Sequence, residues 1–149
     1  MDMHATQAQQ QHIAAMENAL DSMDADAVES ALTSAFQTGL HPTMTAVLIR
    51  LCDAPWHVRH EDVVSALQQV GGAEAIPALE RAALTRHAYL DYDDTAGLAC
   101  KCTWALADIG TTESRLALKR LSAFQESPVA GYAQRRISRW SDERARKRG

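Results

Sequence analysis

A pattern of nine residues occurs twice in this chain, and it limits the possible folds more than any other feature of the sequence. The segment 66–74, Ala-Leu-x-x-Val-Gly-x-x-Glu, returns at 105–113 as Ala-Leu-x-x-Ile-Gly-x-x-Glu, 39 residues later. Repeats of about forty residues are typical of helix pairs, which must stack on one another because a single pair cannot bury its apolar face. The repeat therefore predicts an all-α fold, a right-handed α-solenoid of about seven or eight helices.

Composition agrees with one domain spanning residues 1–149, since 46% of the residues are hydrophobic and 5% are aromatic. The first eleven residues are polar, and no run of eighteen apolar residues occurs. These features predict a cytoplasmic protein without a membrane partner. Three cysteines without CxxC spacing are expected to be reduced thiols in the core or just beneath the surface.

Charge is distributed unevenly along the chain. Residues 135–149 hold seven basic and two acidic side chains, whereas residues 1–134 hold eight basic and seventeen acidic ones. An acidic body repels phosphates, so nucleic acid is not the expected partner. The basic tail after Ser141 has two interpretations: it attracts phosphates, or it is a solvated, frayed helix end whose cations favour the helix dipole.

Apolar residues at helical spacing predict a series of helices, with Gly39 ending the second and Thr43 capping the third. The helix from Thr95 to Ile109 is expected to be the most deeply buried. Trp104 lies off the apolar stripe of that helix and is expected to pack against a neighbouring repeat, without a functional role. The predicted helices cover approximately 13–20, 28–36, 44–51, 63–70, 75–83, 95–109, 117–124 and 128–140.

The segment 70–79, Val-Gly-Gly-Ala-Glu-Ala-Ile-Pro-Ala-Leu, resembles the turn and second helix of HEAT-type repeats. The resemblance is best over residues 56–140; residues 1–55 form divergent N-terminal helices and 141–149 the basic C-terminal tail. It implies a HEAT-like solenoid that works as a binding surface. Small bacterial proteins of this class include immunity proteins that neutralise a toxin, partner-binding adaptors, and chaperone-like lyases of bilin attachment.

Two connections between predicted helix pairs, 53–62 and 86–94, mix aromatic, acidic and imidazole side chains. In a stack of antiparallel pairs such connections leave at the same end, so we expect them to form one acidic, aromatic edge that suits a basic protein. Two other roles remain open, because the aromatic rings could close the core and the aspartates could cap the helix from Thr95. The candidate partner-binding residues are Trp56, His57, His60, Glu61, Asp62, Tyr89, Asp91, Tyr92, Asp93 and Asp94.

Neither a metal nor a cofactor is predicted. His57, His60 and the acids supply suitable ligand types, but the two histidines share a helical face only if a helix begins before His57, and Pro55 makes a later start equally plausible. The motifs of nucleophile elbows, phosphate loops and H-E-x-x-H metalloproteases do not occur.

The sequence therefore predicts a non-catalytic protein-binding module, most specifically an immunity protein that neutralises a basic toxin. A general scaffold or regulatory adaptor is one alternative, and an enzyme or bilin-lyase-like chaperone is the other.

Overall fold

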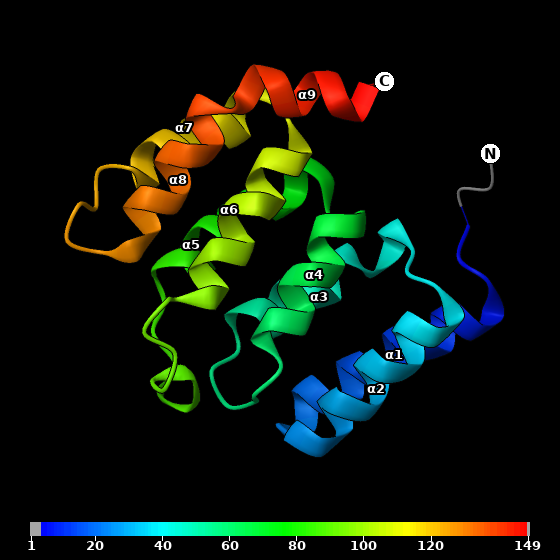
Figure 1. Cartoon of the computed structure of the whole chain (residues 1–149). Coiled ribbons are helices and arrows are strands. Elements are labelled where there is room, and N and C mark those ends of the chain that lie inside the picture. Colours follow the sequence, from blue (N-terminus) through cyan, green and yellow to red (C-terminus); the bar gives the residue numbers. More distant parts are fainter. Residues whose placement is uncertain (1–3, 149) are drawn as a thin grey trace. The chain divides into compact units, whose positions relative to one another are not determined.

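The computed structural model describes residues 4–148 and the side chains of residues 4–146, and within this range it contains helices and no strand. The chain divides into two compact units, unit 1 (Met1–Ala75) and unit 2 (Ile76–Gly149), each described here by itself (Figure 1). The all-helical prediction is confirmed. The described residues form nine α-helices, slightly more than the predicted seven or eight.

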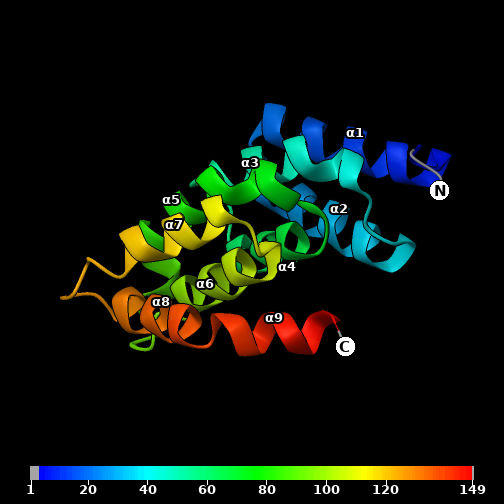
Figure 2. The same ribbon diagram turned by 90° about the horizontal axis from the view of Figure 1, so that it is seen from above.

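Unit 1 consists of two helix pairs. α1 packs against α2 and α3 against α4, while α1 also contacts α3 and α2 contacts α4 (Figure 2). Each helix thus has one neighbour within its pair and one in the other pair, which lets its apolar stripe be covered on two sides. The helices of unit 1 are α1 (Gln7–Ser22), α2 (Ala25–Thr38), α3 (Thr45–Asp53) and α4 (His60–Val70), with short 3-10 turns η1 (Pro42–Met44) and η2 (Gly72–Ala75).

Local signals explain most helix ends in unit 1. The Asp24 side chain accepts a hydrogen bond from the backbone N–H of Ala27 and caps α2, and Gly39 ends that helix with a φ of +110°. The prediction that Thr43 caps α3 is wrong. Pro42 starts a helical turn two residues earlier than the predicted helix, so Thr43 already lies inside η1 and Met44 takes the cap position without a side-chain bond.

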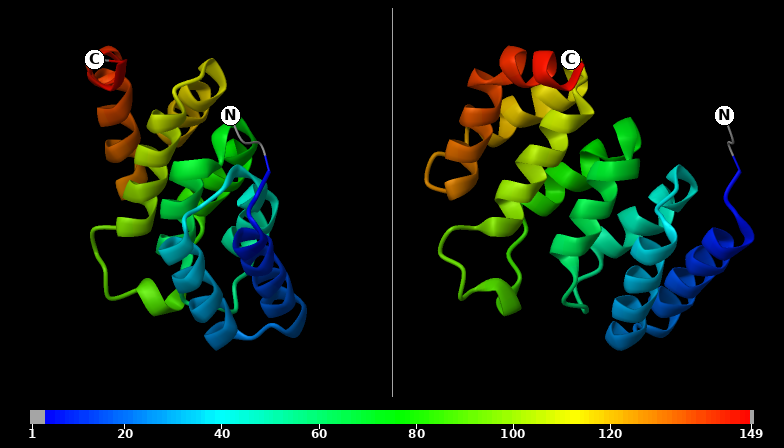
Figure 3. Two further views of the ribbon diagram at one scale, coloured as in Figure 1. Left: turned by 90° about the vertical axis from the view of Figure 1, so that its right-hand side faces the viewer. Right: turned by 45° about the vertical axis from the view of Figure 1, so that its right-hand side comes forward.

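Unit 2 repeats the same packing scheme with a terminal addition. α5 packs against α6 and α7 against α8, α5 contacts α7 and α6 contacts α8, and α9 contacts α8. Figure 3 shows the long connection between α5 and α6, which projects from the ends of these helices. The helices of unit 2 are α5 (Ile76–Leu84), η3 (Ala88–Leu90), α6 (Gly97–Ile109), α7 (Thr112–Leu121), α8 (Pro128–Ser138) and α9 (Trp140–Arg148).

The α6 helix carries the apolar stripe that the sequence indicated. Leu98, Cys102, Ala105 and Leu106 are buried, although the helix begins at Gly97 rather than Thr95. Phe124, the last residue of the predicted helix 117–124, lies beyond the end of α7 and is 48% exposed.

The C-terminal segment differs from the sequence prediction. One of the two interpretations of the tail after Ser141 was a solvated, frayed helix end, whereas Trp140–Arg148 form α9. Glu143 of α9 lies 2.9 Å from the guanidinium of Arg136 on α8, and both side chains are buried. This contact gives the segment a packing partner that its composition does not reveal. No described helix combines the length and apolar character that a membrane span requires.

Candidate functional site

His57 and His60 lie in the connection between α3 and α4, where both imidazole rings are buried. The His57 Nε2–H donates to the Leu51 carbonyl at 2.7 Å, and the His60 Nε2–H donates to the Ala54 carbonyl at 2.6 Å. Carbonyls at the C-terminal end of a helix lack partners within the helix, so the two rings satisfy the end of α3.

The protonation state of His57 follows from its contacts. Its Nδ1 accepts a hydrogen bond from the backbone N–H of Arg59 at 3.0 Å, while Nε2 donates to Leu51, so the ring is the neutral Nε2–H tautomer. Burial lowers the pKa of His57 below its ordinary value, against the opposing effect of the bond to the Leu51 carbonyl. His57 therefore stabilises the core and does not lie on an exposed surface.

The predicted aromatic and acidic residues of unit 1 lie in the same connection and in the first turn of α4. Trp56 is half-buried with its ring edge against His57, at 5.5 Å between centroids. Glu61 and Asp62 occupy the first turn of α4, where carboxylates favour the helix dipole. Asp62 is exposed, and Glu61 is partly exposed. Of the predicted residues in unit 1, the two acids thus remain accessible while the two histidines do not.

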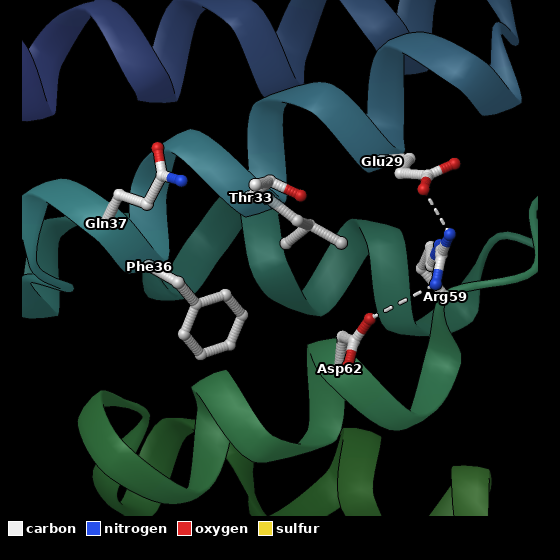
Figure 4. A pocket seen from close by; sticks show the side chains of 7 residues that line it. Glu29, Thr33, Phe36, Gln37, Arg59 and Asp62 are labelled. Carbon is white, nitrogen blue, oxygen red and sulfur yellow. Dashed lines mark ion pairs between the residues drawn. The ribbon is translucent and has the colours of Figure 1, made fainter.

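Asp62 borders a groove between α2 and α4 that the sequence did not indicate. Figure 4 shows Glu29 of α2 pointing to Arg59 and Phe36 of α2 pointing toward α4, which begins with Asp62 in its first turn. Arg59 forms ion pairs with Glu29 and, at 3.9 Å, with Asp62. The groove has a volume of about 300 Å³, and we call it the α2/α4 groove. It is lined by Glu29, Leu32, Thr33, Phe36, Gln37, Arg59 and Asp62.

The unit that contains this groove is strongly acidic. Unit 1 holds ten acidic side chains and two basic ones, Arg50 and Arg59, for a formal charge of −8. Phe36 and Val58, which are 37% and 53% exposed, add apolar surface within the same unit. Acidic and apolar surface together is the combination that the sequence analysis expected at the helix-pair connections.

The connection between α5 and α6 contains the predicted residues of unit 2. Tyr92 is 81% exposed, and Asp91 and Asp94 are exposed as well. Asp91 accepts a hydrogen bond from the Arg86 side chain at 2.8 Å, and Tyr89 is partly buried with its ring 5.7 Å from that of His87. Because the two connections belong to different units, their expected common edge stays a prediction.

Asp93 has a structural role in this connection. Its carboxylate accepts hydrogen bonds from the backbone N–H groups of Thr95 and Gly97, both at 2.9 Å, and from the Thr95 hydroxyl. These bonds to Thr95 and Gly97 lower the pKa of Asp93. The alternative interpretation of Asp93 as a cap is therefore supported in part: its carboxylate bonds the first backbone N–H group of α6, although Ala96 holds the N-cap position itself, with a φ of +53° and no side-chain bond.

A second group of polar side chains, in unit 2, was missed by the sequence analysis. The Arg136 guanidinium lies over the Trp104 ring, 3.6 Å from its centroid, and pairs with Glu143 on its other side. Trp104 does contact a neighbouring helix, as expected, yet 41% of it remains exposed. No periodicity links residues 104, 136 and 143, so nothing in the sequence joins them.

Within residues 4–148, no group of three or more histidine, cysteine, aspartate or glutamate side chains is arranged to hold a metal ion. Comparison of the chain with protein families, curated proteins and solved structures gave no match.

Proposed function

We propose that this chain is a non-catalytic protein-binding module that captures a basic protein through the acidic surface of unit 1. The α2/α4 groove supports this proposal most directly, because it presents two carboxylates beside the exposed ring of Phe36 in a unit of charge −8. Aromatic anchors supply much of the affinity of protein interfaces, while complementary charge speeds association and selects the partner.

Arg59 suggests how a cationic partner engages the groove. Its guanidinium pairs with Glu29 and lies 3.9 Å from Asp62, with side-chain exposures of 36%, 51% and 53% for the three residues. Exposed ion pairs contribute little to stability. A lysine or arginine of the partner can therefore replace Arg59 in these ion pairs with little loss of folding free energy. In this proposal Arg59 occupies, in the free protein, the position that the partner's cation takes in the complex.

The exposed residues of the α5–α6 connection extend the proposal to unit 2. Asp91, Tyr92 and Asp94 are accessible, and they have the acidic and aromatic character expected of the partner-binding edge. The HEAT-like right-handed solenoid belongs to the same proposal, and the repeat of segment 66–74 at 105–113 supports it. The most specific form is an immunity protein whose partner is a basic toxin.

The test is affinity purification from the native host followed by calorimetry on the purified complex. The groove variant is Glu29→Lys/Asp62→Lys, and the control Glu17→Lys/Asp21→Lys changes the charge of unit 1 equally through α1 residues outside the groove. We expect one basic partner at stoichiometric amount, retained by the control and lost by the groove variant. Retention by the groove variant, or an acidic partner, would contradict the proposal.

A second pair of measurements separates the forms of the proposal. Asp91→Ala/Tyr92→Ala tests the α5–α6 connection and leaves the bond of Asp93 to the start of α6 in place. An immunity protein has one partner, which harms the host when expressed alone and is harmless with this chain. Several partners with a shared motif would favour a general adaptor instead.

A further inference from the structure

Unit 2 also contains a groove, and its lining carries the opposite charge to the lining of the α2/α4 groove in unit 1. It lies where α6, α8 and α9 meet and has a volume of about 490 Å³, and we call it the α6/α8/α9 groove. The indole of Trp104 comes from α6, two arginines come from α8, Arg139 follows the end of α8, and α9 adds the remaining two residues. The lining residues are Trp104, Arg135, Arg136, Arg139, Glu143 and Arg146.

The cations of this groove are only partly neutralised. Glu143 lies 2.9 Å from Arg136 and 3.6 Å from Arg139, so one carboxylate serves two guanidinium groups. Four arginines and one glutamate leave the lining with a formal charge of +3. Unit 2 as a whole holds thirteen basic and nine acidic side chains, a formal charge of +4. The groove is therefore suited to an anionic ligand.

The arginines differ in accessibility, and this difference assigns them different roles. Arg136 is 5% exposed, held between the Trp104 ring and Glu143. Arg135, Arg139 and Arg146 are exposed. Burial lowers the pKa of Arg136, and the charges of Arg135 and Arg139 lower it further against the effect of Glu143. Three like charges thus lie within residues 135–139, and a bound anion would reduce the repulsion between them.

Trp104 distinguishes this groove from a simple cationic patch. Its ring stacks with the Arg136 guanidinium on one side, yet 41% of the residue remains exposed beside the groove. Nucleobases stack on such aromatic platforms in proteins that bind single strands, while arginines track the phosphates. An acidic peptide would engage the arginines, whereas a single strand can also use the exposed part of the indole. Paired bases in a duplex are not free to stack on it.

We propose that the α6/α8/α9 groove binds single-stranded nucleic acid, with the phosphates on its exposed arginines and one base stacked on Trp104. The inference is independent of the proposed protein partner, because it rests on other residues in the other unit. It revises the expectation that nucleic acid is not a partner, which followed from the summed charge of residues 1–134. Folding places Trp104 beside the basic residues of α8 and α9, and the linear charge distribution does not show this.

The test is fluorescence anisotropy of the full chain with a labelled single-stranded twelve-nucleotide DNA, its RNA counterpart and the corresponding DNA duplex. With three phosphates on Arg135, Arg139 and Arg146, the single-strand affinity should fall about twenty-fold between 50 and 200 mM salt. The variant with alanine at these three positions should lose about two units of the slope of log K against log salt. Comparison of the two single-stranded probes shows whether the groove binds DNA or RNA more tightly.

Two sets of controls make the test specific. Arg86→Ala/Lys119→Ala/Arg120→Ala removes the same charge from unit 2 outside the groove and should bind like the wild type. Trp104→Ala should weaken single-strand binding about five- to a hundred-fold, and Trp104→Phe should lose less because a ring remains for stacking. The folded state of each variant is checked by circular dichroism.

Three outcomes would overturn the inference. Equal loss of binding in the groove variant and the charge-matched control would show unspecific attraction to unit 2. Duplex binding as tight as single-strand binding, with no effect of Trp104→Ala, would exclude stacking. Displacement of the oligonucleotide by polyglutamate of equal charge would instead assign the groove to an acidic protein, and sedimentation would show whether that protein is a second copy of this chain.

Discussion

The imidazole rings of His57 and His60 stack nearly parallel at the end of α3, with centroids 4.0 Å apart and 16° between their planes. Each ring donates to a backbone carbonyl, so a pair of residues with metal-ligand chemistry serves to close a helix end. Protonation of His57 would place a charge at a buried site that lacks hydration, and this couples the stability of unit 1 to pH.

Unit 1 should lose stability as the solution becomes acidic. Because the pKa of His57 is lowered in the folded state, the unfolded chain binds more protons, and folding stability falls with falling pH. The contribution of neutral His57 to the free energy of unfolding is fully present above the ordinary imidazole pKa of 6.5. It is lost as the pH falls from there through the pKa of the folded state.

Urea unfolding at pH 7.5, 6.5 and 5.5 measures this loss. His57→Gln keeps a donor for the Leu51 carbonyl without the titration, so its pH slope should be smaller, and an equal slope would rule out His57 as the cause.

Breaking the buried ion pair of unit 2 should destabilise α9. Glu143→Gln leaves the Arg136 cation buried without its counterion, at a cost of about 2 kcal/mol, less than for a fully enclosed pair because the residues border an open groove. Thermal unfolding and hydrogen exchange of α9 measure the loss. Arg136→Met/Glu143→Leu should regain most of it, and the exposed Glu126→Gln is the neutral control. A Glu143→Gln protein as stable as the wild type would contradict the importance of the pair.

Replacement of two glycines by alanine should change the free energy of unfolding in opposite directions. A Cβ at Gly71 would lie 2.7 Å from the Cβ of Ala75 and from the Leu67 carbonyl oxygen, although the backbone there is helical. Gly71→Ala should therefore lower the free energy of unfolding. Gly131 lies in α8 with nothing within 4 Å of its added Cβ, so Gly131→Ala should raise the free energy by about 0.5–1 kcal/mol. Chemical denaturation of both variants tests the contrast, and the same sign for both would contradict it.

The three thiols should react unequally. Cys52 and Cys102 are 5% and 0% exposed, whereas Cys100 is half-buried, and none of the three forms a disulfide bond. In the native protein a thiol reagent should modify Cys100 much faster than the others, because access limits the reaction of a buried thiol. Mass spectrometry after brief alkylation identifies the modified residue. Denatured protein, in which all three should react, is the control, and early labelling of Cys102 would show that α6 opens locally.

Much of the fold could be predicted from the sequence because helix formation is largely local. The apolar stripe of α6, the end of α2 at Gly39 and the break after Val70 all follow from side-chain spacing or from the conformational freedom of glycine. Thr43 was misplaced because Pro42 begins a turn before it. The helix at Trp140–Arg148 was missed because its composition is that of a solvated tail.

The candidate sites were less predictable, since they depend on residues far apart in the chain. The sequence shows the residue type at each candidate position but not the environment of the side chain. In the structure His57 and His60 are buried, the Asp93 carboxylate bonds the start of α6, and Tyr92 is exposed. The ion pair of Arg59 with Glu29 and the stack of Arg136 on Trp104 span about thirty residues of sequence each.

The sequence by itself determined that the chain is helical, where most helices begin and end, and that its acidic and basic residues are segregated, because these properties depend on residues within a few turns of one another. Only the tertiary structure decided which polar side chains are buried and which line a groove. Burial and proximity depend on how helices pack, and packing brings together residues such as Trp104 and Arg136 that no local pattern connects.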